Sequence, residues 1–322
     1  MTEVGPLFGN SIYPGRHEID CGYPLGADAL RMCFGGRQPR PDQSIEDMFS
    51  EALEHRDYSP IEALAGQLMK ADYYLARQLV SRESNCYLEF FRTFTGSQFL
   101  TFNYDSLPEA ILFHMGRWYP RDGYGTQVRA ELPPWKESEY SDRKSSSMVL
   151  HLHGSLCVTT SEFQTVRKSG SAIGWIEERE KPLFAFDPAS IGGLFGPFQR
   201  RPGDFDVRDR IIAPVRDKSD GLRRIFVRTI HERALELVRY SGAVVSIGYS
   251  FGNHDKHSYE PILNALAGSH ERRLTLISPH ASKLSEKLQS EFSSLNIYPM
   301  ERTFKEWWQQ GFRLGKKESE PA

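Results

Sequence analysis

The chain has 322 residues, of which 25% are charged and 39% hydrophobic, a balance typical of globular proteins and unlike that of disordered ones. Lys and Arg number 40 against 42 for Asp and Glu, so no net positive charge draws the chain to nucleic acid or to an anionic membrane. The composition therefore gives no direct signal of a nucleic-acid partner.

The four cysteines form no Cys-x-x-Cys pair, which excludes a zinc ribbon and favours free thiols in a reducing compartment. No apolar run approaches the length that crosses a bilayer, and the first residues lack the charged-then-apolar pattern of a secretory signal. We therefore expect a cytoplasmic protein with no membrane partner.

Helical patterns dominate the first hundred residues, after an initial stretch rich in Gly and Pro. The predicted helices cover residues 27–33, 45–55, a segment from 60 onward, and about 85–94. Ser44 is a good N-cap for the second of them, and Pro60 suits the first position of the third. Residues 44–95 therefore form a predicted helical insertion before the first strong strand.

The middle of the chain alternates strong apolar runs with polar excursions. Apolar residues predict strands at 99–102 and 148–152, with a helix at 107–115 between them. The polar stretch 121–147 predicts an irregular surface excursion, and Gly and Pro break residues 158–220 into a second irregular insertion.

The last third has the clearest pattern, because helices and strands alternate regularly. The predicted elements are a helix at 222–240, a strand at 243–247, a helix at 259–267, a strand at 274–277, a helix at 281–292 and an edge strand at 296–298. A β-α-β rhythm of this kind indicates a parallel sheet. We therefore predict one α/β domain over 1–322, with a doubly wound, mostly parallel Rossmann-like sheet, the helical insertion and no zinc ribbon.

Three short polar segments follow three of the predicted strands. They are Thr101–Asp105, His151–Ser155 and Gly248–Phe251. Each alone has an ordinary structural explanation: a turn pair for Asn103 and Asp105, a β-turn for the second segment and a strand-to-helix turn for the third. Because open α/β sheets bind ligands beyond the carboxyl ends of their strands, the three together indicate a nucleotide site.

These segments resemble motifs of the sirtuin superfamily, more closely its microbial sirtuin-like branch than its protein deacetylases. That family has a Thr-x-Asn-x-Asp motif, a Leu-His-Gly motif whose histidine is the catalytic base, and a Gly-Tyr/Thr-Ser turn on the nucleotide. They correspond here to Thr101–Asp105, Leu152–Gly154 and Gly248–Ser250. The run Ala243–Asp255 is the most specific piece, and the resemblance extends from about Gly22 to Tyr298.

Three departures from the family pattern bear on the reaction. Phe102 stands where the deacetylases have Gln, and the structural zinc ribbon is absent, so both features disfavour an acyl-peptide reaction. The family's opening Gly-rich loop, whose backbone N–H groups bind pyrophosphate, has no clear counterpart. Gly22–Gly26 resembles the segment just after that loop, while upstream only Phe8–Ser11 is comparable. Truncation, a rebuilt loop and loss of NAD binding all remain open.

The resemblance implies the chemistry of NAD, whose bond from nicotinamide to ribose breaks through an oxocarbenium-like sugar. Asn103 would hold the ribose hydroxyls or the attacking water, and His153 would take a proton near neutral pH. The residues expected to bind the nucleotide are Asp105, Gly154, Gly248, Tyr249, Ser250 and Ser278.

Other polar and aromatic residues favour structural roles. His151 would face the same side as His153 on an extended strand, but core or surface placement is favoured over a helper role. The group His254, Asp255 and His257 lacks a second cluster at suitable spacing, so we expect no metal. Phe251 is expected in the core, and Trp307–Trp308 are expected to pack a C-terminal helix onto the domain.

By resemblance, the leading hypothesis is an NAD⁺ hydrolase of the antiphage-defence type that releases nicotinamide and ADP-ribose. ADP-ribosyl transfer or NAD-dependent deacylation is the first alternative, and a non-catalytic nucleotide sensor or assembly subunit is the second. Since such hydrolases are usually held silent, the resemblance also implies a homo-oligomer or a companion defence protein.

Overall fold

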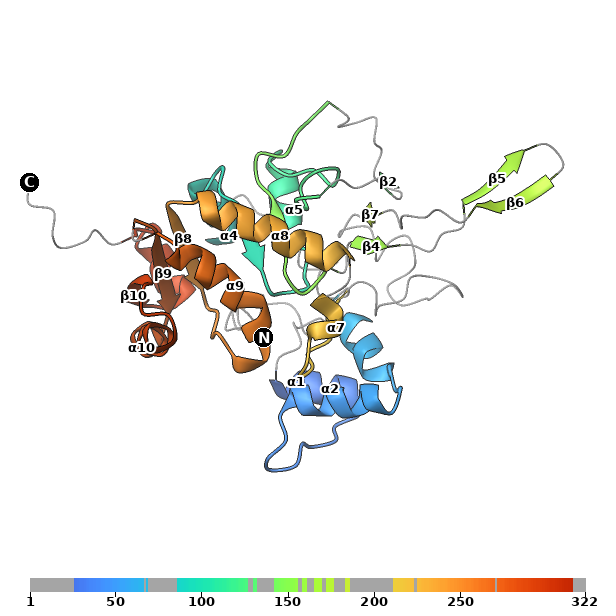
Figure 1. The fold of residues 1–322 in the computed structure, drawn as a ribbon, viewed down its shortest axis with the longest axis horizontal. Helices are drawn as coiled ribbons and strands as arrows, with labels where there is room; N and C mark the ends of the chain where they lie inside the picture. The colour runs from blue at the N-terminus through green and yellow to red at the C-terminus, as the bar shows by residue number, and fades with distance from the viewer. Residues whose placement is uncertain are drawn as a thin grey trace, which may run out of the picture.

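The computed structural model describes most of the chain outside the N-terminus and the middle excursions. The described residues are 26–66, 68, 86–126, 130–131, 142–155, 158–160, 165–169, 172–176, 183–185, 211–222, 225–269 and 271–314. The N-terminal segments considered as a phosphate loop, Phe8–Ser11 and Gly22–Leu25, lie outside this part. The described chain mixes helices with small parallel sheets, as expected of an α/β fold (Figure 1).

The helices predicted in the first hundred residues are confirmed where the structure describes them. They are α1 (Gly26–Phe34), α2 (Ile45–Glu54), a helical segment at 59–66 and α4 (Cys86–Thr93). The first three contribute to one buried apolar cluster, which includes Cys33, Phe49, Leu64 and, from the segment after the first strand, Tyr104. This cluster fixes the helical module against the region where the predicted site begins.

The N-terminus of α2 is closed by a capping box. The Asp47 amide donates to Ser44 Oγ at 3.1 Å, and the Ser44 amide donates to Asp47 Oδ2 at 2.7 Å. The box satisfies two backbone N–H groups that the first turn would otherwise leave unpaired.

Replacing Ser44 with Ala should lower the free energy of unfolding by about 1 kcal/mol, because the cap hydrogen bond to Asp47 is lost. Chemical denaturation of the purified chain measures this change. Ser282→Ala, at an exposed position of another helix, is the matched control and should change stability little. Equal stabilities of the two variants would contradict the capping role.

Two small parallel sheets form the centre of the fold. In the first, β1 (Phe99–Thr101) pairs with β3 (Val149–His151), and α5 (Leu107–His114) follows β1. In the second, the strand order is β10-β9-β8, from β8 (Ala243–Ile247), β9 (Arg273–Ser278) and β10 (Asn296–Glu301). Helices α9 (Lys256–Ala267) and α10 (Ala281–Glu291) connect these strands. The β-α-β rhythm predicted for the last third is confirmed.

Helices cover both faces of the second sheet because the side chains of β9 alternate. Leu274 and Leu276 belong to the main core with residues of α9, α10 and the long helix α8 (Ile225–Tyr240). Ile277 belongs to a second cluster, with Trp307 of α11 (Phe304–Gln309). In Figure 1, α8 and α9 run side by side. The expected packing role of Trp307 is confirmed, since it is fully buried.

The prediction that residues 158–220 are irregular is wrong for several segments, which the structure describes as strands or a helix. They are β4 (Val158–Thr160), β5 (Thr165–Ser169), β6 (Ala172–Ile176), β7 (Leu183–Ala185) and α7 (Ser219–Leu222). β5 and β6 form an antiparallel pair, and β7 pairs with β4 and with β2 (Ala130–Glu131), which lies in the polar excursion before β3. These strands have five residues or fewer, too short for their apolar periodicity to show among Gly and Pro.

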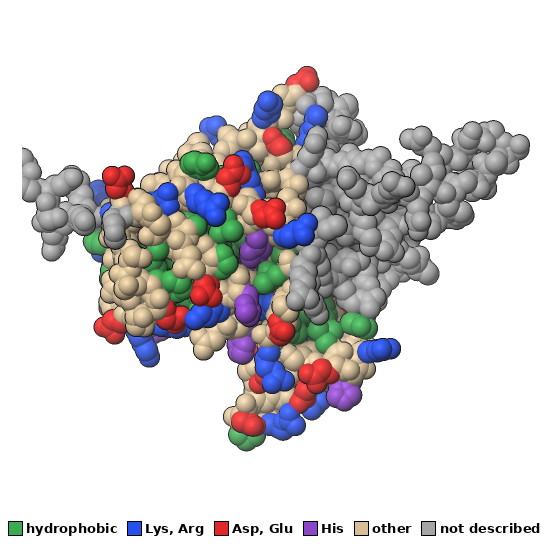
Figure 2. All heavy atoms as spheres, in the orientation of Figure 1, with side chains coloured by type: hydrophobic (Ala, Val, Ile, Leu, Met, Phe, Trp, Pro, Cys, Tyr) green, Lys and Arg blue, Asp and Glu red, His purple; other side chains and the backbone are tan. Residues whose placement is uncertain are grey.

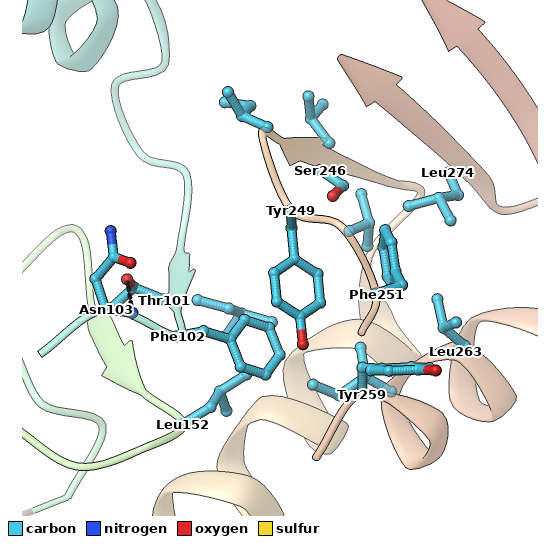
Figure 3. Close-up of a pocket in the computed structure, with 15 residues that line it drawn as sticks. Thr101, Phe102, Asn103, Leu152, Ser246, Tyr249, Phe251, Tyr259, Leu263 and Leu274 are labelled. Atoms are coloured by element: carbon cyan, nitrogen blue, oxygen red, sulfur yellow. Dashed lines mark hydrogen bonds between the residues drawn. The ribbon is translucent and has the colours of Figure 1, made fainter. Parts of the chain in front are cut away.

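The facing edges of the two parallel sheets border one apolar cavity of about 210 Å³ (Figure 3). The cavity is lined by consecutive residues of both sheets. They are Leu100–Phe102, from β1 and the residue after it, and Val244–Ile247 of β8. Since side chains alternate along a strand, consecutive residues line one cavity where it runs along the strand edge. No described strand pairs across this gap.

The surface carries mixed charge. Figure 2 shows Lys and Arg side chains interspersed with Asp and Glu over the face in view. Among the helices in the described ranges, none has the length and apolar character needed to cross a membrane.

Candidate active site

The polar segments that follow β1, β3 and β8 meet at a cavity of about 130 Å³. Four of the eight residues predicted for the site, Asn103, His153, Tyr249 and Ser250, line it. The other described lining residues are Glu46, Leu64, Leu68, Phe102, Tyr104, Pro214, Lys218, Gly252, His254 and Asp255. The structure therefore brings Asn103 and His153 to one cavity.

Two hydrogen bonds, one to the backbone amide of Asn103 and one to its carbonyl, fix this residue in the turn after β1. Its amide donates to Thr101 Oγ1 at 3.0 Å, and its carbonyl oxygen lies 3.0 Å from His151 Nδ1. The next residue, Tyr104, is buried in the helical module, and its hydroxyl donates to the carbonyl of Ile212. In Figure 3 the Asn103 side chain points away from the ring of Phe102. The local backbone thus fixes the turn in which Asn103 lines both this cavity and the one between the sheets.

His153 lies in the turn that follows β3, and backbone contacts with Ile211 and Ile212 hold this turn in place. The Ile212 amide donates to the His153 carbonyl at 2.7 Å, and Gly154 forms a bridge with Ile211. Gly154 has a φ of +85°, which favours glycine at this turn. The imidazole is only 3% exposed. The edge of the Phe102 ring packs against it, with the centroids 5.1 Å apart.

Nε2 of His153 faces two polar groups from the region after β8. Ser258 Oγ lies 3.4 Å from it, and Asp255 Oδ1 lies 3.5 Å from it. Burial, and after it the charge of Lys218, lowers the pKa of His153 to about 3. The imidazole is therefore neutral at neutral pH and is in the form that accepts a proton.

Asp255 ends the short 3₁₀ helix η6 (Asn253–Asp255) and collects several contacts. Its Oδ1 accepts a hydrogen bond from Lys218 Nζ, and its Oδ2 accepts one from the Tyr249 hydroxyl at 3.1 Å. Lys218 itself is 6% exposed. Burial alone would raise the pKa of Asp255, but the neighbouring His153 and Lys218, with the hydrogen bonds from Lys218 and Tyr249, lower it below its usual value. The cavity thus contains a half-buried carboxylate and a buried ammonium beside the imidazole.

A stacked ring pair separates this cavity from the apolar one between the sheets. The rings of Phe102 and Tyr249 have centroids 4.1 Å apart and are inclined by 5°, and both residues line both cavities (Figure 3). Burial, together with the charge of Asp255, raises the pKa of Tyr249, so its hydroxyl remains a donor. Phe251, predicted as core, is confirmed there at 4% exposure.

The other four predicted nucleotide-binding residues are not among the described residues that line the cavity. Asp105 is buried, and its Oδ1 accepts from the Leu107 amide at 3.3 Å, as in a local turn. Gly154 is engaged in the bridge described above. The Gly248 amide donates to the Ile277 carbonyl at 2.9 Å. Ser278 Oγ accepts from the His280 amide at 3.2 Å. These backbone and turn contacts are typical of strand ends and turns.

His151 faces away from His153 because β3 ends at His151 and the alternation of a strand does not continue. Its Nε2 lies 2.6 Å from Glu109 Oε1 of α5, and both side chains are fully buried. Burial alone would lower the pKa of His151, but the paired Glu109 carboxylate raises it. Of the two structural placements expected for His151, core and surface, the structure shows the core, and the sequence did not indicate its buried partner.

No known protein-family model matches the chain, and no curated protein is significantly similar to it.

Sequence analysis missed the role of two charged residues in this cavity. Lys218 lies in the segment predicted as an irregular insertion, so no periodic pattern pointed to it. In the sequence, Asp255 stands out only as the end of the Ala243–Asp255 run and, with His254 and His257, as a metal group that is not expected to bind. Within the described ranges, no set of three or more His, Cys, Asp or Glu side chains is arranged to hold a metal ion. A signal for Asp255 was its place seven residues after Gly248, in the turn that begins α9.

Proposed function

We propose that the protein is a sirtuin-like NAD⁺ hydrolase that releases nicotinamide and ADP-ribose in the cytoplasm, as part of antiphage defence. The observation that carries this proposal is that Asn103 and His153, which follow β1 and β3, line one cavity. The order of motifs along the chain supports the same assignment. A homo-oligomer or a companion defence protein would keep the activity silent.

The reaction requires the protein to position the ribose and the attacking water and to provide a base. The C1′–N bond of the substrate breaks with its electrons passing to nicotinamide, which leaves neutral, so no strong acid is needed. Asn103 would orient the ribose hydroxyls or the attacking water. Neutral His153 would take the proton of the water as its oxygen bonds to C1′. A weak base is sufficient because the oxocarbenium-like sugar is a strong electrophile.

The size of the cavity bears on how the dinucleotide enters. Its volume of about 130 Å³ is below the roughly 300–1,000 Å³ of typical small-molecule pockets. The Phe102 and Tyr249 rings form the partition toward the larger apolar cavity. We propose that these rings move when NAD⁺ binds. We also propose that the two parallel sheets belong to one doubly wound, Rossmann-like arrangement, as the helices on both faces of β9 suggest.

The test is chromatographic assay of nicotinamide and ADP-ribose after incubation of the full chain with NAD⁺. We expect release by the native protein and a fall of about 100- to 1,000-fold in kcat for Asn103→Ala, the size found when one preorganised hydrogen-bonding group is lost. His257→Ala, an exposed polar change beyond the cavity, is the control and should keep the native rate. A native rate in Asn103→Ala would contradict the site assignment.

Two further measurements separate the alternatives. ADP-ribosyl transfer would appear as a mass increase on a protein incubated with NAD⁺, without free ADP-ribose. A nucleotide sensor would bind NAD⁺ or ADP-ribose in calorimetry without releasing nicotinamide. Release of neither product and no heat of binding would exclude the proposal and both of these alternatives.

A further inference from the structure

The carboxylate of Asp255 gathers side chains from three separate parts of the chain. His153 comes from the turn after β3, Lys218 from the segment that precedes α7, and Tyr249 from the turn after β8. Lys218 and Tyr249 each donate to a different oxygen of the carboxylate, so its position is fixed from two directions. The remaining contact of Oδ1 is with Nε2 of His153.

We propose that Asp255 is the positioning residue of His153: held by Lys218 and Tyr249, it keeps the imidazole hydrogen on Nε2 and leaves Nδ1 to accept a proton. This inference rests on the proposed hydrolysis of NAD⁺. A carboxylate beside one ring nitrogen selects the tautomer in which that nitrogen carries hydrogen. Ser258 Oγ, on the same side of the ring, offers a second acceptor to that hydrogen.

The arrangement also provides for the charge that forms during the reaction. As the water oxygen bonds to C1′ and the C1′–N bond breaks, the water proton passes to Nδ1 of His153. The resulting imidazolium is buried, and the carboxylate beside Nε2 stabilises it. The positive charge of Lys218 disfavours the protonated form of His153. Lys218 is also paired with Asp255, and this pairing limits how strongly the carboxylate stabilises the imidazolium. The proton then leaves to solvent and restores the neutral ring.

The first test is Asp255→Asn, which keeps the size of the side chain and removes its charge. We expect kcat for nicotinamide release to fall by about 10- to 100-fold, as for other groups that orient a functional histidine, with KM unchanged. In a long-range ¹H–¹⁵N correlation spectrum of the full chain, native His153 should show the Nε2–H tautomer. The variant should show both neutral tautomers. Glu260→Gln, a carboxyl change on α9 outside the cavity lining, should match the native protein in both measurements.

Tyr249→Phe provides a second variant if Asp255→Asn does not fold, because it removes only the hydroxyl that donates to Oδ2. It should lower kcat in the same direction by a smaller factor. A native tautomer and native kcat in a folded Asp255→Asn protein, or in Tyr249→Phe where that variant alone folds, would overturn the inference. If the native protein releases no nicotinamide, the proposed function fails, while the tautomer of His153 still decides whether Asp255 governs the ring.

Discussion

Replacing His153 with Ala is expected to lower kcat for nicotinamide release by about 100- to 10,000-fold, the usual contribution of a general base. The imidazole is neutral at neutral pH, since burial and Lys218 lower its pKa to about 3, and in the proposed reaction it takes the proton of the attacking water. Without it, the proton of the attacking water has to pass directly to solvent. Steady-state assay of nicotinamide at saturating NAD⁺ measures the effect.

The assay of this variant needs a check that the nucleotide still binds and that the chain still folds. His153 is 3% exposed, so its truncation to Ala leaves a cavity, and His153→Gln is the variant that better preserves the packing. Both should bind ADP-ribose in calorimetry while losing turnover. A folded His153→Gln protein that turns over NAD⁺ at the native rate would remove His153 from the reaction.

Replacing Glu109 with Ala is expected to cost about 3–5 kcal/mol of stability, as when one member of a buried ion pair is removed. Its partner His151 is fully buried and would be left without the carboxylate that raises its pKa. Denaturation of the full chain with urea measures the loss. Glu232→Ala, at an exposed position of α8, should stay within about 0.5 kcal/mol of the native protein.

The pair also predicts a pH dependence of stability. Because the pKa of His151 is raised in the folded protein, its contribution is fully present below roughly pH 6.5, the unfolded value, and is lost as pH rises through the folded pKa. The free energy of unfolding of the native chain should therefore decline across that interval. Glu109→Gln should flatten the decline. If the free energy of unfolding of Glu109→Gln declined with pH as steeply as that of the native chain, the pair of His151 and Glu109 would not be the cause of the decline.

The predictable part of the fold follows from local patterns. The apolar runs before Asn103, His153 and Gly248 are strands, and the N-cap at Ser44 begins a helix, because side-chain periodicity and capping are determined by neighbouring residues. The convergence of Asn103 and His153 could be predicted because the ends of parallel strands meet at one edge of a sheet.

The rest of the site depends on long-range contacts that no local pattern encodes. Lys218 reaches the cavity because the segment before it is anchored by the backbone bond between Ile212 and His153 and by the bridge to Gly154. His151 and His153 have different surroundings because β3 ends at His151. The local sequence does not specify where this strand ends. Partners of this kind, including Glu109 for His151, become visible only in the folded chain.

The gap between β1 and β8 has a consequence for how the protein loses activity. Asn103 and His153 follow strands of one sheet, whereas Tyr249, Ser250 and Asp255 follow a strand of the other, and no described ladder of backbone bonds joins the two. Among the described residues, side-chain contacts hold the two halves together: the stacked Phe102 and Tyr249 rings, and the polar contacts of His153 with Ser258 and Asp255. A modest separation along this seam would disassemble the proposed reaction centre while each half kept its secondary structure, so loss of the proposed activity on heating is expected to precede global melting.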